Sequence, residues 1–209
     1  SPLSAYILGK IIHDIDFPVG VVNILSGPTN EVATTLSKSK IPSVLTMIGS
    51  TATGQRVIAD SSTSIKKLSM ELGGNAPFIV FEDADIDKAL DLAIGIKFGN
   101  SGQICVAANR FFVHKSLYNS FLEKYVERVN NLKLGFGIDQ KPDMGPMVTK
   151  NDRDRMFDLI NDAKEKGGVL LAGGEIPKGM KDGNWMMPTV ISGMTTEMRL
   201  FREETFGPI

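Results

Sequence analysis

The stretch Val44-Leu45-Thr46-Met47-Ile48-Gly49-Ser50-Thr51 contains the turn that decides the fold class. Its first five residues form a short apolar run, which predicts a buried strand. Gly49-Ser50-Thr51 then opens a helix that we expect to extend to about Ala59. The same alternation continues on both sides, with strands predicted at 21–25 and 65–70 and helices at 3–14 and 31–37. Strand–helix–strand units with fully apolar strands predict an α/β fold in which helices cover both faces of a parallel sheet.

A second part of the chain starts at Gly73-Gly74, so we place a boundary between residues 72 and 73. Strands are predicted at 78–80, 110–114, 169–171 and 188–191. Helices are predicted at 83–99, 117–132, 149–166 and 198–201. One face of the first of these helices keeps helical spacing, and it consists of Ile86, Leu90, Ala93, Ile94 and Lys97.

Composition excludes several classes of function. The 209 residues carry a net charge of −1, so the chain has no electrostatic signature of a partner such as nucleic acid or an anionic membrane. We find no signal peptide and no apolar run of about 18 residues, the length that a membrane span needs. One cysteine and two histidines cannot form an internal disulfide or a zinc site of several such ligands, which favours a cytoplasmic or organelle-matrix setting.

We expect a fragment, because Ser1 is not an initiator methionine and the end at 206–209 does not look like a natural C-terminus.

Cys105 is the first residue with potential chemistry. It lies in the polar, glycine-containing segment Asn100-Ser101-Gly102-Gln103-Ile104-Cys105, directly after a predicted helix. A lone cysteine is most often a small buried hydrophobic residue, whereas a position in a polar loop favours a reactive thiol. Both interpretations stay open on these residues alone.

Glu71 and the segment 49–54 are two further candidates. Glu71 interrupts the apolar stretch 68–72 just before Gly73-Gly74, where a carboxylate can reach a cleft or form an ordinary loop ion pair. The segment Gly49-Ser50-Thr51-Ala52-Thr53-Gly54 follows a strand and opens a helix, so its amides can bind a phosphate group. A plain strand-to-helix turn explains this segment equally well, since it is not the G-x-G-x-x-G pattern of dinucleotide-binding proteins.

Four ordered motifs resemble the aldehyde dehydrogenase superfamily. They are Gly-Ser-Thr-x-x-Gly at 49–54, Glu-Leu-Gly-Gly at 71–74, Gly-Gln-x-Cys at 102–105 and Glu-Glu-x-Phe-Gly-Pro at 203–208. The segment 20–27 is similar to the Gly-Val-x-Asn-x-x-x-Gly stretch of the same family. Within the family, the segments 70–81 and 100–110 look most like succinate-semialdehyde dehydrogenases.

This resemblance implies oxidation of a small aldehyde, with succinate semialdehyde as the first candidate, to a carboxylic acid with NAD or NADP. It implies that Cys105 is the nucleophile and that Glu71 is the base that activates the water that hydrolyses the thioester. It further implies that Gly49, Ser50 and Gly54 lie near the pyrophosphate. Leu72 is expected to touch the nicotinamide, Glu204 to bind its ribose and Phe206 to pack near the ring.

The resemblance also implies an organisation and an assembly. Residues 1–72 correspond to the C-terminal part of a Rossmann-like NAD(P)-binding domain, and residues 73–209 to a truncated α/β catalytic domain. The parent protein is expected to be a homodimer or homotetramer without bound metal.

The chain departs from the family at three functional positions. An arginine that some succinate-semialdehyde dehydrogenases carry six residues before the cysteine is Gly99 here, and glycine cannot pair with a carboxylate. A second cysteine of some relatives is Ala107 here. The asparagine that donates to the oxyanion in this family has no counterpart, since neither Asn75 nor Asn100 matches its motif.

Three alternatives remain beside this interpretation. A semialdehyde dehydrogenase that transfers the acyl group to CoA usually lacks the glutamate, so Glu71 argues against it. A cysteine hydrolase or transferase could pair Cys105 with His114. A catalytically silent fragment could serve only in folding or assembly.

Overall fold

The computed structural model describes residues 2–138 and 141–209, and the chain divides into two compact units. Unit 1 comprises Ser1–Leu72 and unit 2 comprises Gly73–Ile209. None of the helices in the described ranges is long and apolar enough to cross a membrane. The functional roles expected for the two parts of the chain stay predictions.

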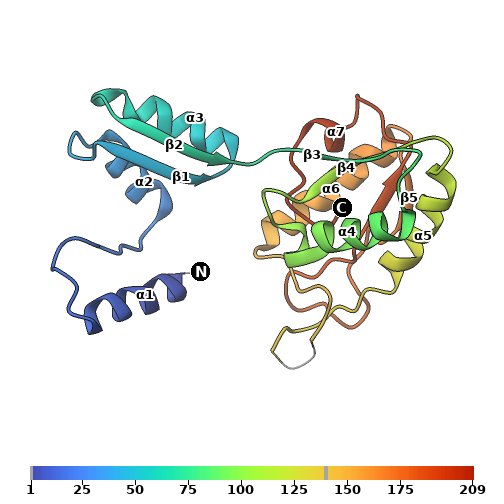
Figure 1. The fold of residues 1–209 in the computed structure, drawn as a ribbon, viewed down its shortest axis with the longest axis horizontal. Coiled ribbons are helices and arrows are strands. Elements are labelled where there is room, and N and C mark those ends of the chain that lie inside the picture. The colour runs from blue at the N-terminus through green and yellow to red at the C-terminus, as the bar shows by residue number, and fades with distance from the viewer. Residues whose placement is uncertain (1, 139–140) are drawn as a thin grey trace. The chain divides into compact units, whose positions relative to one another are not determined.

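Unit 1 contains two parallel strands and three α-helices among its described residues. Its elements are α1 (Pro2–Asp14), α2 (Thr29–Lys38), β1 (Val44–Gly49), α3 (Thr51–Asp60), the short 3-10 helix η1 (Ser61–Thr63) and β2 (Lys67–Leu72). β1 pairs with β2 in parallel, with Leu45 opposite Leu68. Figure 1 shows α2 and α3 beside the two strands. The predicted strand–helix–strand unit around 44–51 is therefore present.

β1 is buried on one face only. Leu45 and Met47 are half-buried and line a hollow together with Val32 of α2 and Val57 of α3. The intervening residues are exposed, and Ile48 is 80% exposed. Successive side chains of a strand point to opposite faces, and the contacts of α2 and α3 lie on the Leu45 side. The expectation of a fully buried strand is thus wrong for the other face.

Residues 21–25 do not form the predicted strand. The Val21 N–H donates to the carbonyl oxygen of Pro18, and the Asn23 side chain donates to that of Gly20. These bonds close local turns, and among the described residues of unit 1 only β1 and β2 pair as strands. The backbone N–H and C=O groups of a strand need hydrogen bonds to a neighbouring strand. The apolar, β-branched composition of residues 21–25 was therefore not sufficient to form one.

Unit 2 contains the remaining elements, most of which lie within a few residues of their predicted positions. They are β3 (Ala76–Val80), α4 (Ile86–Phe98), the 3-10 helix η2 (Gly99–Gly102), β4 (Ala108–Val113), α5 (Tyr118–Asn130), α6 (Lys150–Glu165), β5 (Val169–Ala172), β6 (Val190–Ser192) and α7 (Arg199–Arg202). β3 and β4 are parallel, whereas β5 and β6 are antiparallel.

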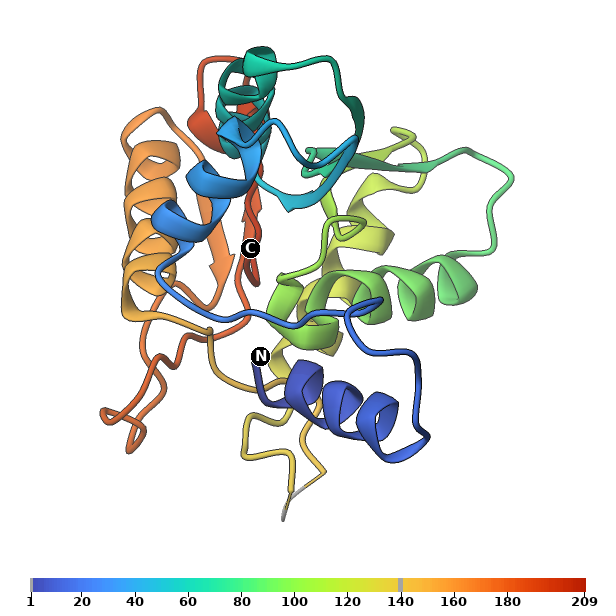
Figure 2. The same ribbon diagram turned by 90° about the vertical axis from the view of Figure 1, so that its left-hand side faces the viewer.

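Two apolar clusters form the core of unit 2. The first joins β3, β4, α4 and α5 through buried side chains that include Leu90, Phe98, Phe121 and Val129. The second gathers around the buried face of α6, which lies beside β5 (Figures 1 and 2). Burial of this kind contributes about 25 cal/mol per Å² of apolar surface, so these clusters stabilise the packing of the helices and strands of unit 2.

Lys97 is an unusual member of the buried face of α4. Its side chain is fully buried, in the same helix as Leu90, Ala93 and Phe98, and burial lowers the pKa of its amine from 10.5 to about 7. The shift arises because a charged amine loses its hydration in the interior. At a pH at which the solvated amine is charged, burial of Lys97 therefore lowers the free energy of unfolding.

We expect Lys97→Met to flatten the pH dependence of unit 2 stability. Between pH 7 and about 10.5 the unfolded chain binds the proton that the folded chain lacks, so the free energy of unfolding of the wild type increases with pH. Each pKa unit corresponds to about 1.4 kcal/mol, and the variant lacks this term. Urea titrations at several pH values, followed by fluorescence of the single tryptophan Trp185 in unit 2, measure the slope. Identical slopes for the two proteins would contradict the expectation.

Candidate functional site

The carboxyl ends of β1 and β2 lie side by side in unit 1. Ile48 is opposite Glu71, and Gly49 is opposite Leu72. Ligands of α/β proteins commonly bind outside the carboxyl ends of parallel strands. Three of the residues predicted from the sequence, Gly49, Glu71 and Leu72, therefore share one edge of this two-stranded sheet.

The turn from β1 into α3 leaves an open helix N-terminus. Ser50 is the N-cap, and its Oγ accepts a hydrogen bond from the Thr53 N–H at 3.2 Å. Among the described residues, the N–H groups of Thr51 and Ala52 have no hydrogen-bond acceptor. Such free amides at a helix start, together with the helix dipole, can receive a phosphate group.

Gly54 allows α3 to pack closely on β2. A β carbon at this position would lie 2.7 Å from Cδ2 of Leu72, which is closer than real side chains approach. The predicted residues Gly49, Ser50, Gly54 and Leu72 are thus brought together in unit 1 by backbone proximity.

Glu71 has an exposed side chain on β2. It forms no ion pair with any residue of the described ranges 2–138 and 141–209. The alternative of an ordinary loop ion pair therefore finds no support, because Glu71 is in a strand and its carboxylate is unpaired among these residues.

The loop that carries Cys105 begins with a left-handed turn in unit 2. Asn100, Ser101 and Gly102 have φ values of 49°, 58° and 69°, respectively. This backbone region disfavours residues with a β carbon by about 1–2 kcal/mol each. Asn100 and Ser101 therefore need other contacts that hold them in place.

Polar contacts supply this support. The Ser101 side chain is 2% exposed, and its hydroxyl donates to the carbonyl oxygen of Gly145 at 2.8 Å. Gln103 is 8% exposed; its Nε2 donates to the Asn100 carbonyl at 3.1 Å, and its Oε1 accepts from the Val148 N–H at 2.9 Å. The turn is thus tied to the segment that precedes α6.

Cys105 itself is exposed, between buried Gln103 and buried Ala107. The alternative of a small buried hydrophobic residue does not describe it. The Cys105 N–H has no hydrogen-bond acceptor among the described residues. An exposed thiol next to a free backbone donor, on a fixed turn, is an arrangement that suits a nucleophile.

His114 does not belong to this loop. Its Nδ1 is 2.8 Å from the Ser116 hydroxyl, and its Nε2 is 3.5 Å from the Glu82 carboxylate. Cys105 precedes β4 and His114 follows it, so the extended strand separates them by about 20 Å at roughly 3.3 Å per residue. The alternative of a Cys105–His114 pair is therefore wrong.

The segment 203–207 lies against the Cys105 loop in unit 2. A β carbon at Gly102 would overlap with the carbonyl oxygen of Gly207, and a β carbon at Gly73 would overlap with the Glu204 carboxylate. Three of the four motifs recognised in the sequence therefore meet through glycines, which leave room for a neighbouring group.

Glu203 and Glu204 have different surroundings. Arg199 pairs with Glu203 at 2.7 Å and, through its hydrogen bond, lowers the pKa of that carboxyl group. Arg155 of α6 donates to the carbonyl oxygens of Glu204 and Thr205 at 2.7 and 2.9 Å. Glu203 thus supports the fold, whereas the carboxylate of Glu204 lies beside Gly73. Phe206 follows with a φ of 50° and is 42% exposed.

Three supports of this site, Ser101, Gln103 and Arg155, could not be identified from the sequence. Gln103 was part of a recognised motif, but its partner Val148 is 45 residues away. Arg155 lies on a predicted amphipathic helix, where an arginine is ordinary. No local pattern identifies such partners.

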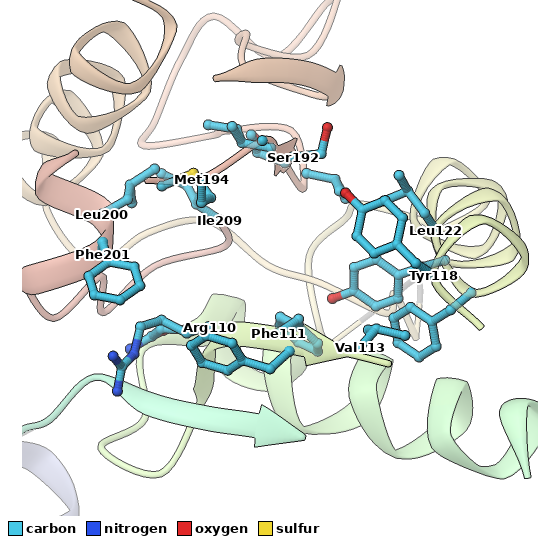
Figure 3. Close-up of a pocket in the computed structure, with 18 residues that line it drawn as sticks. Arg110, Phe111, Val113, Tyr118, Leu122, Ser192, Met194, Leu200, Phe201 and Ile209 are labelled. Atoms are coloured by element: carbon cyan, nitrogen blue, oxygen red, sulfur yellow. The ribbon is translucent and has the colours of Figure 1, made fainter. Parts of the chain in front are cut away.

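A separate pocket of about 340 Å³ lies between β4, α5 and the C-terminal segments of unit 2. Figure 3 shows Tyr118 and Leu122 on one side of it and Leu200, Phe201 and Ile209 on another. None of the predicted site residues lines it. Among the described residues there is also no cluster of three or more His, Cys, Asp or Glu that could hold a metal ion.

Comparison with known proteins assigns the chain to a family. Residues 1–209 match the family described as "Aldehyde dehydrogenase family". The chain is 39% identical over its whole length to succinate-semialdehyde dehydrogenase [NADP(+)] 1 of Schizosaccharomyces pombe and covers 42% of that protein. It is also 39% identical to 3-sulfolactaldehyde dehydrogenase of Pseudomonas putida, of which it covers 43%.

A solved structure with a similar fold is that of betaine aldehyde dehydrogenase from Staphylococcus aureus in complex with NAD+. The TM-score is 0.96 and the identity 32%, and the match covers 100% of this chain and 42% of the other. The chain therefore spans less than half the length of the relatives that it matches.

We expect Gly102→Ala to destabilise unit 2 by about 2–4 kcal/mol, because the new β carbon combines a left-handed backbone with an overlap in a packed interior. Urea unfolding followed by Trp185 fluorescence measures the loss. Gly95→Ala is the matched control: Gly95 is in α4, and a β carbon there meets no atom within 4 Å. That control should gain about 0.5–1 kcal/mol, and equal effects of the two substitutions would refute the proposed constraint.

Proposed function

The chain belongs to the aldehyde dehydrogenase family, and from this premise we propose that it carries the nucleophile and the base of an NAD(P)-dependent aldehyde oxidation. The observation that carries the proposal is the exposed Cys105, which follows a left-handed turn that packs against the segment that contains Glu204. Unit 2 is then part of the catalytic domain, and unit 1 is part of the domain that binds the cofactor.

Cys105 starts the proposed reaction. Its thiolate attacks the carbonyl carbon of the aldehyde, and the resulting oxyanion accepts a hydrogen bond from the Cys105 N–H, which is free among the described residues. Loss of the hydride from that carbon leaves a thioester on Cys105. A positioned oxyanion donor contributes about 100- to 1000-fold in rate, so the rigid turn before Cys105 has a direct chemical role.

The cofactor assignment is proposed separately for the residues at the end of β1 in unit 1 and for the residues beside Gly73 in unit 2. The free amides of Thr51 and Ala52, with Gly49, Ser50 and Gly54, suit a pyrophosphate, and Leu72 is assigned to the nicotinamide face. Glu204 is assigned to the nicotinamide ribose and Phe206 to the ring. Bound NAD or NADP supplies the acceptor for the hydride. By their names, the yeast relative uses NADP(+) and the Staphylococcus protein binds NAD+.

Glu71 completes the reaction in this proposal. It takes a proton from a water molecule, the hydroxide attacks the thioester carbon, and the Cys105 thiolate leaves as the carboxylic acid is released. The exposed position of Glu71 and its lack of an ion pair among the described residues support this role. Transfer of the acyl group to CoA would not require this base.

We propose a semialdehyde, with succinate semialdehyde as the first candidate, as the substrate. Similarity to the yeast enzyme supports this choice. Gly99 offers no charge, so in this proposal another residue of the protein recognises the carboxylate of the substrate. Comparing kcat/KM for succinate semialdehyde with that for betaine aldehyde, with NAD and NADP in turn, tests both assignments. Self-association and a cytoplasmic location remain predictions for the whole protein.

We expect Cys105→Ala to abolish oxidation in the whole protein and Glu71→Gln to retain acylation but lose hydrolysis. A single turnover with aldehyde and cofactor should then leave an acyl adduct on the tryptic peptide that contains Cys105, measured by mass spectrometry. Glu71→Asp is the control that retains a carboxylate. Normal turnover of Cys105→Ala, or the absence of an adduct in Glu71→Gln, would sink this mechanism.

We expect Gly73→Ala to weaken cofactor binding by about tenfold, which corresponds to about 1.4 kcal/mol. The added methyl group overlaps with the Glu204 carboxylate and must displace it. Gly74→Ala is the matched control, because a β carbon at Gly74 meets no atom within 4 Å. Fluorescence titration with NAD and NADP measures both variants; a similar Kd for the two would argue against a role of Glu204 at the ribose.

A further inference from the structure

The buried Lys97 lies at the base of the loop that carries Cys105. It is in the last turn of α4, and the loop begins at Gly99, two residues later. The backbone also meets the loop here, since a β carbon at Gly102 would lie 2.9 Å from the Lys97 carbonyl oxygen. Both the side chain and the main chain of Lys97 are therefore placed to influence the turn before Cys105.

One hydrogen bond closes the base of this loop. Lys97 Nζ donates to Asn109 Oδ1 at 2.8 Å. Asn109 is the second residue of β4, so the bond joins α4, the last α-helix before Cys105, to the first strand after it. Asn109 Oδ1 accepts this bond, which fixes the orientation of the Asn109 amide. Asn109 Nδ2 then points to the Gly74 carbonyl oxygen, at 3.4 Å.

Burial of the Lys97 amine costs free energy that an apolar residue in the same place would not cost. In the described residues it forms no ion pair, and its only side-chain partner is a neutral amide. Burial lowers its pKa to about 7, as expected for an amine that loses its hydration. An apolar side chain of similar length would fill the same volume without this cost. A purely structural role therefore explains poorly why a lysine occupies this position.

We propose that Lys97 is a positioning residue for Cys105: its hydrogen bond to Asn109 fixes the two ends of the loop that carries Cys105. The bond holds the end of α4 at a set distance from the start of β4, and the turn at 100–102 and Cys105 lie between these two points. This proposal rests on the proposed function, since it assigns to Lys97 the geometry of the nucleophile. Displacing a reacting group by about 1 Å can cost about 100-fold in rate.

The test compares Lys97→Met, Asn109→Leu and the double variant in the whole protein. Each single change leaves the other polar group without this partner, which lowers stability, whereas the double change removes both groups and leaves two apolar side chains. Trp185 fluorescence reports whether unit 2 is folded. We expect the double variant to recover stability but to keep a roughly 10- to 100-fold lower kcat, with KM within about threefold of the wild type.

A second readout does not depend on turnover. Cys105 is the only cysteine among the 209 residues, so alkylation of its tryptic peptide by iodoacetamide reports the thiol directly. We expect a changed alkylation rate in the double variant. Wild-type kcat and alkylation rate in a stable double variant would overturn the proposal. If the double variant does not fold, the kcat of Lys97→Met is measured instead, at a temperature at which that variant is folded. A wild-type kcat in that measurement would also overturn the proposal.

Cys105→Ala in the otherwise unchanged protein separates this proposal from the proposed function. If that variant keeps its aldehyde oxidation, the nucleophile assignment fails whatever the Lys97 variants do. If it loses activity while the Lys97 and Asn109 variants keep theirs, the proposed function stands and the positioning role fails.

Discussion

The close approach of Gly102 to Gly207 is the contact on which the candidate site of unit 2 depends. Because Gly102 has no side chain, the backbone of the Cys105 loop can lie directly on the carbonyl group of Gly207. Gly102 has a left-handed backbone at this contact, and the left-handed turn extends back through Ser101 and Asn100. A thiol and a carboxylate-bearing segment that are about a hundred residues apart in sequence thereby belong to one surface.

Glycines at the other motifs have a similar physical role. Gly73 leaves room for the Glu204 carboxylate, and Gly54 leaves room for Leu72 at the start of α3. In each case the small residue is needed for the proximity of a neighbour and not for flexibility. Motifs that look like independent patterns in the sequence thus contact one another in the structure.

Polar groups then hold the strained turn in place. Ser101 and Gln103 tie it to the segment 145–148, Arg155 holds the carbonyls at 204 and 205, and Lys97 bonds to Asn109 at the base of the loop. Hydrogen bonds of this kind contribute only about 1 kcal/mol each, but a missing partner costs more than that. Such a network favours one geometry over many, which a nucleophile requires and an apolar core alone does not provide.

The sequence by itself determined the helices, most strands, the family and the residues proposed for the chemistry. Helical spacing and capping residues act within a few positions, since helices satisfy their hydrogen bonds locally. Residues 21–25 show where this fails, because a strand needs a neighbour that its own composition does not specify. The exposed face of β1 is a second case, as alternation does not say what covers each side. Lys97 belonged to the predicted face of its helix, but the sequence did not indicate its burial or its partner. Only the tertiary structure decided that Cys105 is exposed and that His114 is remote from it. It also decided that Lys97, Gln103 and Arg155 support the loop. The physical reason is that these contacts join residues that are distant in sequence, so they depend on how the elements pack.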